Sequence, residues 1–141
     1  MDGNKATVLY ESAWRLVGKP YIWGGDNPVL GFDCSGLIIE LLTTVGMWPP
    51  KKDTTAQGLY YHFEQFGQIG KKEFGSLVFY GKDLNLITHV AMIIEPGFIL
   101  EAGSGGSKTK TVQDAIDQDA FVRVRPLENR KDIVAIILPN Y

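Results

Sequence analysis

The spacing of apolar residues in the first half of the chain predicts three helices. Apolar positions recur at helical intervals over residues 4–17, and a glycine and a proline just beyond end the pattern. The run over residues 37–45 is too dense in apolar residues for a surface helix, so it predicts a buried one. A third, shorter helix is expected over residues 54–66, with Asp53 or Thr54 as its N-cap.

The second half of the chain predicts strands. Short runs rich in β-branched and aromatic residues, separated by turn residues, occupy positions 76–80, 88–94, 97–102, 121–124 and 133–138. The first three follow one another closely, which indicates consecutive antiparallel strands in a meander. Helices first and then a meander sheet indicate an α+β fold with a central antiparallel sheet, and we expect one domain over residues 1–141.

Composition and charge exclude several classes of partner. The hydrophobic fraction of 45% suits a globular domain with one core, and a net charge of -2 leaves no basic surface for nucleic acid or an anionic membrane. The first residues lack the charged start and apolar run of a secretory signal, and no apolar stretch approaches the length of a membrane span. We therefore expect synthesis in the cytoplasm.

A single cysteine, Cys34, stands at the start of the predicted buried helix. One cysteine and two histidines do not supply the ligand spacing of a zinc site, so no metal or other cofactor is expected. A helix N-terminus favours the thiolate form of a cysteine, and glycines at 31 and 36 would let a substrate carbonyl approach the backbone N–H groups. The alternative for a lone cysteine is a small hydrophobic residue packed in the core.

His89 and Glu101 are the candidates to complete a catalytic site. Period-two alternation places His89 on the same strand face as Ala91 and Ile93, a polar ring on an apolar face. The turn at 95–97 would bring Glu101 back beside His89, where a carboxylate orients an imidazole. The alternatives are a core histidine with its hydrogen bonds satisfied and a solvated carboxylate at a strand end. His62, on the short third helix, is expected to pack with aromatic side chains.

Five segments together resemble the NlpC-type cysteine peptidases, a papain-like family. They are Gly-Lys-Pro-Tyr-Ile-Trp-Gly-Gly at 18–25, Asp-Cys-Ser-Gly at 33–36, Ser-Leu-Val-Phe-Tyr at 76–80, His-Val-Ala-Met-Ile at 89–93 and Phe-Ile-Leu-Glu-Ala at 98–102. They occur in the family's order. The resemblance implies a papain-like fold in which a helix carries the nucleophile at its N-terminus against a sheet that carries the histidine and a third polar residue.

The same resemblance implies an activity: hydrolysis of an amide bond in peptidoglycan stem peptides through Cys34, His89 and Glu101. It also implies that substrate is bound near the residues that precede and follow the cysteine, namely Tyr21, Trp23, Asp33, Ser35 and Gly36. Two positions depart from the family pattern. Glu101 stands where the family often has histidine, and Ser76 stands where it often has aspartate.

The sequence shows neither a signal peptide nor a wall-binding domain, and in this it resembles family members associated with phage or prophage tails. Such an association would make other tail proteins its partners. Two further hypotheses remain open. In the first, the domain is a non-catalytic tail-assembly or tail-tip module whose site is vestigial. In the second, the acyl group passes to an amine or lipid instead of water. Replacing Cys34 with alanine would leave function intact only in the first of these.

Overall fold

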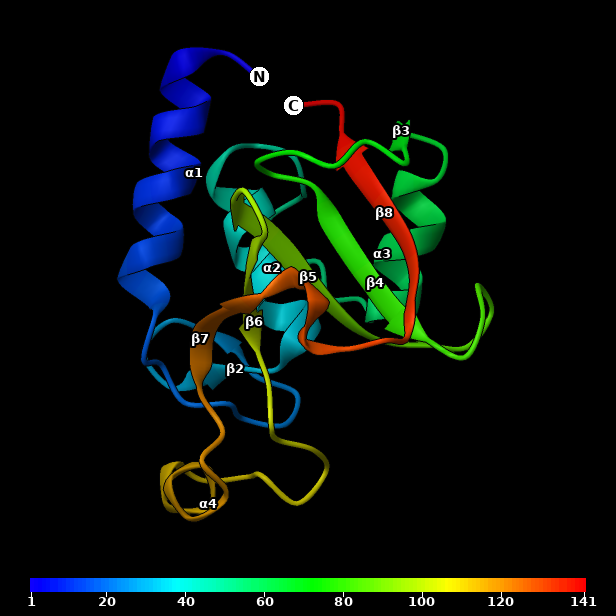
Figure 1. Ribbon diagram of the computed structural model, residues 1–141. Helices are drawn as coiled ribbons and strands as arrows, with labels where there is room; N and C mark the ends of the chain where they lie inside the picture. The colour runs from blue at the N-terminus through cyan, green and yellow to red at the C-terminus, as the bar shows by residue number, and fades with distance from the viewer.

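The computed structural model describes residues 1–141 as an antiparallel sheet with helices packed on one side (Figure 1). The helices are α1 (Gly3–Leu16), α2 (Cys34–Thr44), α3 (Ala56–Phe63) and α4 (Val112–Gln118), with a short 3-10 turn, η1 (Leu127–Asn129). The strands are β1 (Asp26–Asn27), β2 (Gly31–Phe32), β3 (Gly67–Ile69), β4 (Leu77–Gly81), β5 (Ile87–Glu95), β6 (Phe98–Ala102), β7 (Val122–Pro126) and β8 (Ile133–Pro139).

The six-stranded sheet is only partly a meander. Its strand order is β3-β8-β4-β5-β6-β7, so β4 to β7 follow the predicted meander while β8 returns to pair with β4 and β3. The expectation of a simple meander is therefore wrong for the last strand. The reason lies in composition, because β8 is apolar along most of its length and a strand of that kind is protected between two neighbours but not at a sheet edge.

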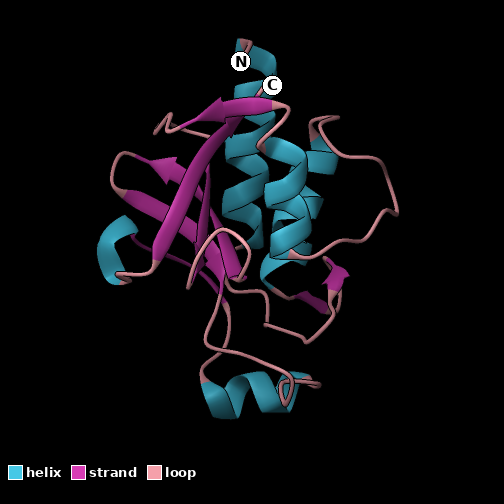
Figure 2. Cartoon of the chain, turned by 90° about the vertical axis from the view of Figure 1, so that its right-hand side faces the viewer, coloured by secondary structure: helices cyan, strands magenta, loops and turns pink.

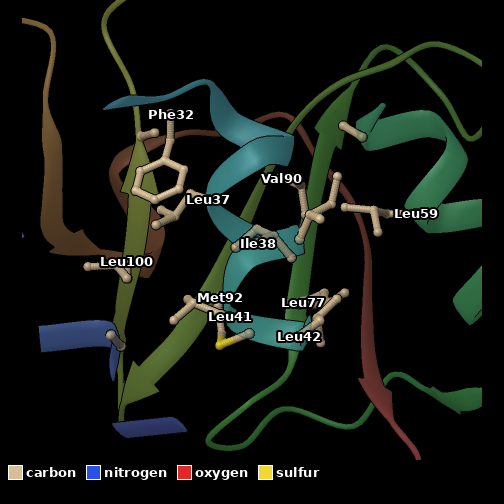
Figure 3. Close-up of a cluster of buried hydrophobic side chains, with 14 of the residues drawn as sticks. Phe32, Leu37, Ile38, Leu41, Leu42, Leu59, Leu77, Val90, Met92 and Leu100 are labelled. Atoms are coloured by element: carbon tan, nitrogen blue, oxygen red, sulfur yellow. The ribbon is translucent and has the colours of Figure 1, made fainter. Parts of the chain in front are cut away.

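The main core lies between the sheet and the helices. Figure 3 shows Leu37, Ile38, Leu41 and Leu42 of α2 among Leu77 of β4, Val90 and Met92 of β5 and Leu100 of β6. Seven of the eleven residues of α2 are buried, as the dense apolar run predicted. Helix α3 packs on β5 and β8, and α1 covers α2, so the three longer helices lie on one side of the sheet (Figure 2).

The opposite face of the sheet carries a second, smaller core. Val78, Tyr80, Ala91, Ile93 and Ile99 alternate with the main-core residues along their strands, and Leu127 of η1 packs on them. Because β8 lies beyond β4 while β7 lies at the other edge, the β7–β8 connection crosses this face. The crossing covers apolar side chains that would otherwise face solvent.

Local details differ from the predictions in three places. The N-cap of α3 is Thr55, whose hydroxyl accepts the Gly58 N–H, and neither Asp53 nor Thr54 has that role. Helix α3 ends at Phe63 because the next residues turn into β3, which pairs with β8. The short strands β1, β2 and β3 and helix α4 were not predicted. No helix combines the length and the apolar character needed to cross a membrane.

Candidate active site

Cys34 is the first residue of α2, and Asp33 caps this end of the helix. The Oδ1 atom of Asp33 accepts the Gly36 N–H at 2.7 Å and the Ser35 hydroxyl at 3.2 Å, which is the contact pattern of an N-cap. The N–H groups of Cys34 and Ser35 have no protein acceptor. They are therefore free donors beside the thiol, at the positive end of the helix dipole.

Close backbone contact fixes the loop before the cysteine against α2. The Asp33 N–H donates to the Gly25 carbonyl at 3.0 Å, and a β-carbon at Gly36 would lie only 1.9 Å from that same carbonyl oxygen. Gly36 is thus required by the packing of the loop on the helix. The loop itself is anchored by Tyr21, whose N–H donates to the Ala120 carbonyl, and by Trp23, whose N–H donates to the Thr109 carbonyl.

His89 and Glu101 meet on neighbouring strands, as the strand alternation and turn predicted. The Nε2 atom of His89 lies 2.7 Å from Oε1 of Glu101, and the two residues are 8% and 3% exposed. The ring of Tyr80, directly across from His89 in the β4–β5 register, packs against the imidazole with 5.3 Å between ring centroids. Nε2 is engaged by the carboxylate, so Nδ1 is the nitrogen left to exchange a proton with Cys34.

A polar cavity of about 360 Å³ joins the three side chains. Its lining comprises Tyr21, Cys34, Thr88, His89, Glu101, Ala102, Gly103, Ser104, Gly105, Arg125, Asn129 and Arg130. The cavity therefore draws on α2, on three neighbouring strands and on the connections that follow β6 and β7. A larger depression of about 800 Å³ lies elsewhere, near the β5–β6 turn, and contains no candidate catalytic residue.

The electrostatics of the cavity favour an imidazolium. Burial by itself would lower the pKa of His89, but hydrogen bonding to Cys34 and Glu101 and the charges of both groups raise that pKa to about 9. Burial would raise the pKa of Glu101, yet its contacts with His89 and nearby Arg125 and Arg130 hold that pKa below its usual range. An imidazole that holds a proton between the Cys34 sulfur and an ionised carboxylate is the arrangement of an activated cysteine nucleophile.

The structure brings only part of the predicted substrate-binding set into the cavity. Tyr21 lines it, and burial followed by the nearby thiol and Asp33 raises the pKa of its hydroxyl, which therefore stays protonated. Trp23 is 54% exposed and lies outside the lining. Asp33, Ser35 and Gly36 also lie outside it and build the helix end that presents Cys34.

Arg125, Asn129 and Arg130 are among the lining residues that were not identified from the sequence. Asn129 and Arg130 were given no role from the sequence; the connection crossing the sheet carries them to the cavity, where Asn129 is exposed and Arg130 is half-buried. Arg125 had a detectable signal: the Val-Arg-Val-Arg alternation of β7 places Arg123 and Arg125 on one face of a strand. Ser76, whose role the sequence left open, is fully buried and its hydroxyl donates to the Lys71 carbonyl in a turn.

The family model for NlpC/P60 proteins matches residues 18–126, a span that contains Cys34, His89 and Glu101. The chain belongs to the NlpC/P60 family. The predicted resemblance to NlpC-type peptidases is thereby confirmed, and so is the papain-like α+β fold.

Two curated relatives of this NlpC/P60 chain are named as endopeptidases. The chain is 35% identical over 123 residues to the bifunctional muramidase/DL-endopeptidase CwlT of Bacillus subtilis, with 82% of this chain and 34% of that protein covered. It is 32% identical over 110 residues to the murein DD-endopeptidase MepH of Escherichia coli, with 74% and 39% covered. The chain thus spans between about a third and two-fifths of the length of these two relatives.

Solved structures of the family share the fold at lower identity. An NLP/P60 protein similar to a lipoprotein, from Staphylococcus aureus, superposes with a TM-score of 0.72 at 23% identity over all of this chain and 43% of that one. The peptidoglycan hydrolase RipB of Mycobacterium tuberculosis gives a TM-score of 0.67 at 24% identity, covering 98% and 66% of the two chains. These likenesses concern the arrangement of helices and strands.

Proposed function

We propose that this NlpC/P60 domain is a cysteine endopeptidase that hydrolyses an amide bond in the stem peptides of bacterial peptidoglycan. Cys34 is the nucleophile, His89 the general acid and base, and Glu101 the residue that orients His89. The observation that carries the proposal is the convergence of these side chains, from α2, β5 and β6, on one cavity with the His89–Glu101 contact formed. The names of CwlT and MepH support the substrate class.

The first half of the reaction forms an acyl-enzyme. With its proton transferred to His89, the sulfur of Cys34 attacks the amide carbonyl carbon, a C–S bond forms, and the carbonyl oxygen gains negative charge. The free N–H groups of Cys34 and Ser35 are placed to stabilise that charge. Protonated His89 then gives its proton to the amide nitrogen, the C–N bond breaks and the amine leaves.

The second half releases the product and restores the site. His89, now neutral, accepts a proton from a water molecule, whose oxygen attacks the thioester carbon. The C–S bond breaks, a carboxylic acid leaves, and the sulfur and His89 regain their starting states. Glu101 remains ionised throughout and keeps the imidazole ring oriented.

The decisive experiment compares wild type with the Cys34→Ala and Cys34→Ser variants on intact sacculi and on free stem peptides, with products identified by mass spectrometry. Wild type is expected to release peptide fragments with and without a chelator, and both variants are expected to release none. Fragment masses identify the bond. Unchanged release by Cys34→Ala would overturn the proposal, and products with added mass would indicate transfer to an acceptor other than water.

Association with a phage or prophage tail stays a prediction without support from the relatives, whose names refer to cell-wall endopeptidases. The same holds for a non-catalytic tail module and for the cellular location. Activity in the assay above, lost with the Cys34 sulfur, would contradict a vestigial site. Fractionation of the producing cells and of their phage particles, followed by detection with an antibody, would test the location.

A further inference from the structure

Glu101 is the only carboxylate that lines the active-site cavity, and its two oxygens have different partners. Oε1 is engaged by His89, while Oε2 lies 3.4 Å from Nε of Arg125 on β7. With only 3% of its surface exposed, Glu101 has little access to water. An ionised carboxylate at such a depth needs a positive partner.

We propose that Arg125 is a positioning residue that keeps the Glu101 carboxylate ionised and aimed at His89. The inference rests on the proposed roles of Cys34, His89 and Glu101. Arg125 acts through Glu101 and does not touch the reacting atoms.

The catalytic cycle explains why His89 alone is an insufficient partner. His89 is positively charged before the attack but becomes neutral once it has protonated the leaving amine. During that interval Glu101 would be a buried anion with no adjacent cation, and taking up a proton would end its ability to orient the ring. A guanidinium does not lose its proton in a protein, so Arg125 supplies a charge that persists through both halves of the reaction.

The contacts of Arg125 fit this role. One guanidinium nitrogen, Nη2, donates to the Ser104 hydroxyl at 3.1 Å, which ties the side chain to the loop after β6. Its Nε is buried and has no hydrogen bond of its own, and Glu101 Oε2 is its ion-pair partner. At 3.4 Å and outside hydrogen-bond geometry, the interaction is chiefly one of charge.

Arg130 does not duplicate this role. Its Nε and Nη2 bind the two carboxylate oxygens of Asp132, and its guanidinium lies over the Tyr80 ring at 4.8 Å. It attracts Glu101 from farther away and lowers its pKa less than Arg125 does. The groups that face the Glu101–His89 pair are therefore Cys34 from α2, Tyr80 from β4, Arg125 from β7, and Arg130 with Asp132 from the crossing connection.

Arg123 provides a matched control on the same strand. It lies directly opposite Glu101 in the β6–β7 register, but its guanidinium binds Asp119. Arg123 and Arg125 therefore share a strand, a face and a charge, and only Arg125 pairs with Glu101. Replacing each with methionine removes the charge and keeps most of the apolar stem.

The test measures alkylation of Cys34 by iodoacetamide as a function of pH, read by mass spectrometry. In Arg125→Met the carboxylate of Glu101 takes up a proton at higher pH, so the acid limb of the alkylation profile is expected to move up by about one pH unit or more. Arg123→Met should leave the acid limb at its wild-type pH. Arg125→Lys, which keeps the positive charge, should show only a small part of the shift. In a Glu101→Gln background, Arg125→Met should cause no further shift.

Three results would overturn the inference: an Arg125→Met profile that superposes on wild type, an equal shift in Arg123→Met, or a shift that persists in the Glu101→Gln background. Thermal melting distinguishes a general loss of stability from the proposed effect, because a general loss would lower the melting temperature without moving the acid limb of the alkylation profile. If Arg125→Met does not fold, Arg125→Gln carries the same expectation, because it keeps polar donors without charge. Alkylation requires no peptidoglycan, so its outcome is independent of whether the wild-type domain cleaves sacculi.

Discussion

The Nε2 atom of His89 lies 2.7 Å from Oε1 of Glu101, although the two residues are twelve positions apart and belong to different strands. The turn between β5 and β6 sets the register that makes this contact possible. The contact of Nε2 with Glu101 orients the imidazole ring, and Nδ1 is left for proton transfer with Cys34. The first prediction follows from this division.

Glu101→Gln is expected to lower kcat/KM by about 10- to 100-fold, because the amide retains an oxygen toward His89 but not the charge that stabilises the imidazolium. Glu101→Ala should lose about 1000-fold or more, since the ring then has no acceptor. Peptide release followed by mass spectrometry measures both. Glu128→Gln, a change on the exposed η1 turn, is the control, and equal activity of wild type and Glu101→Ala would refute the orienting role.

The pH profile should reflect the raised pKa of His89, about 9 against an ordinary 6.5. A raised pKa means that the ring stays protonated to higher pH, so the proton for the leaving amine is lost only as pH rises through about 9. The alkaline limb of kcat/KM is expected there. The stability that the imidazolium contributes to the fold is fully present below pH 6.5 and is lost as pH rises through about 9.

Two measurements check this expectation. The first is kcat/KM between pH 5 and pH 11, and an alkaline limb close to the ordinary pKa of histidine would contradict it. The second is the same profile for Glu101→Gln, whose limb should lie lower, because a partner that raises the pKa of His89 has lost its charge.

Gly105→Ala is predicted to disturb Tyr21 at the cavity wall. A β-carbon at Gly105 would lie 2.2 Å from Cδ1 of the Tyr21 ring, which is buried and cannot retreat freely. We expect a loss of about 1–3 kcal/mol in the free energy of unfolding and a higher KM. Gly106→Ala is the control, since a β-carbon there meets nothing within 4 Å. Equal stability of the two variants would show that Tyr21 can move aside.

Asp33→Ala is predicted to weaken the helix end that presents Cys34. Removal of the N-cap should cost about 1 kcal/mol in the free energy of unfolding and slow the alkylation of Cys34. Thr111→Ala, which removes the N-cap of α4, a helix that contributes no residue to the cavity lining, should cost a comparable amount and leave alkylation unchanged. Chemical denaturation and the alkylation rate are the two readouts, and the prediction fails if both variants alkylate at the wild-type rate.

The sequence by itself determined the elements that carry the candidate catalytic residues. Helical spacing and a dense apolar run located α1 and the buried α2, so that Cys34 could be placed at a helix N-terminus. Period-two alternation and one turn were sufficient to place His89 and Glu101 on adjacent strands. These are local relationships, set by backbone geometry within a few residues, and local patterns report them faithfully.

Only the tertiary structure decided what surrounds those residues. The pairing of β8 with β4 carries Asn129 and Arg130 across the sheet to the cavity, and no local pattern specifies which strand a distant strand will join. The choice between Arg123 and Arg125 as partner of Glu101 is of the same kind, because both occupy equivalent positions on β7. Burial and long-range packing fix these contacts, and they depend on all the elements at once.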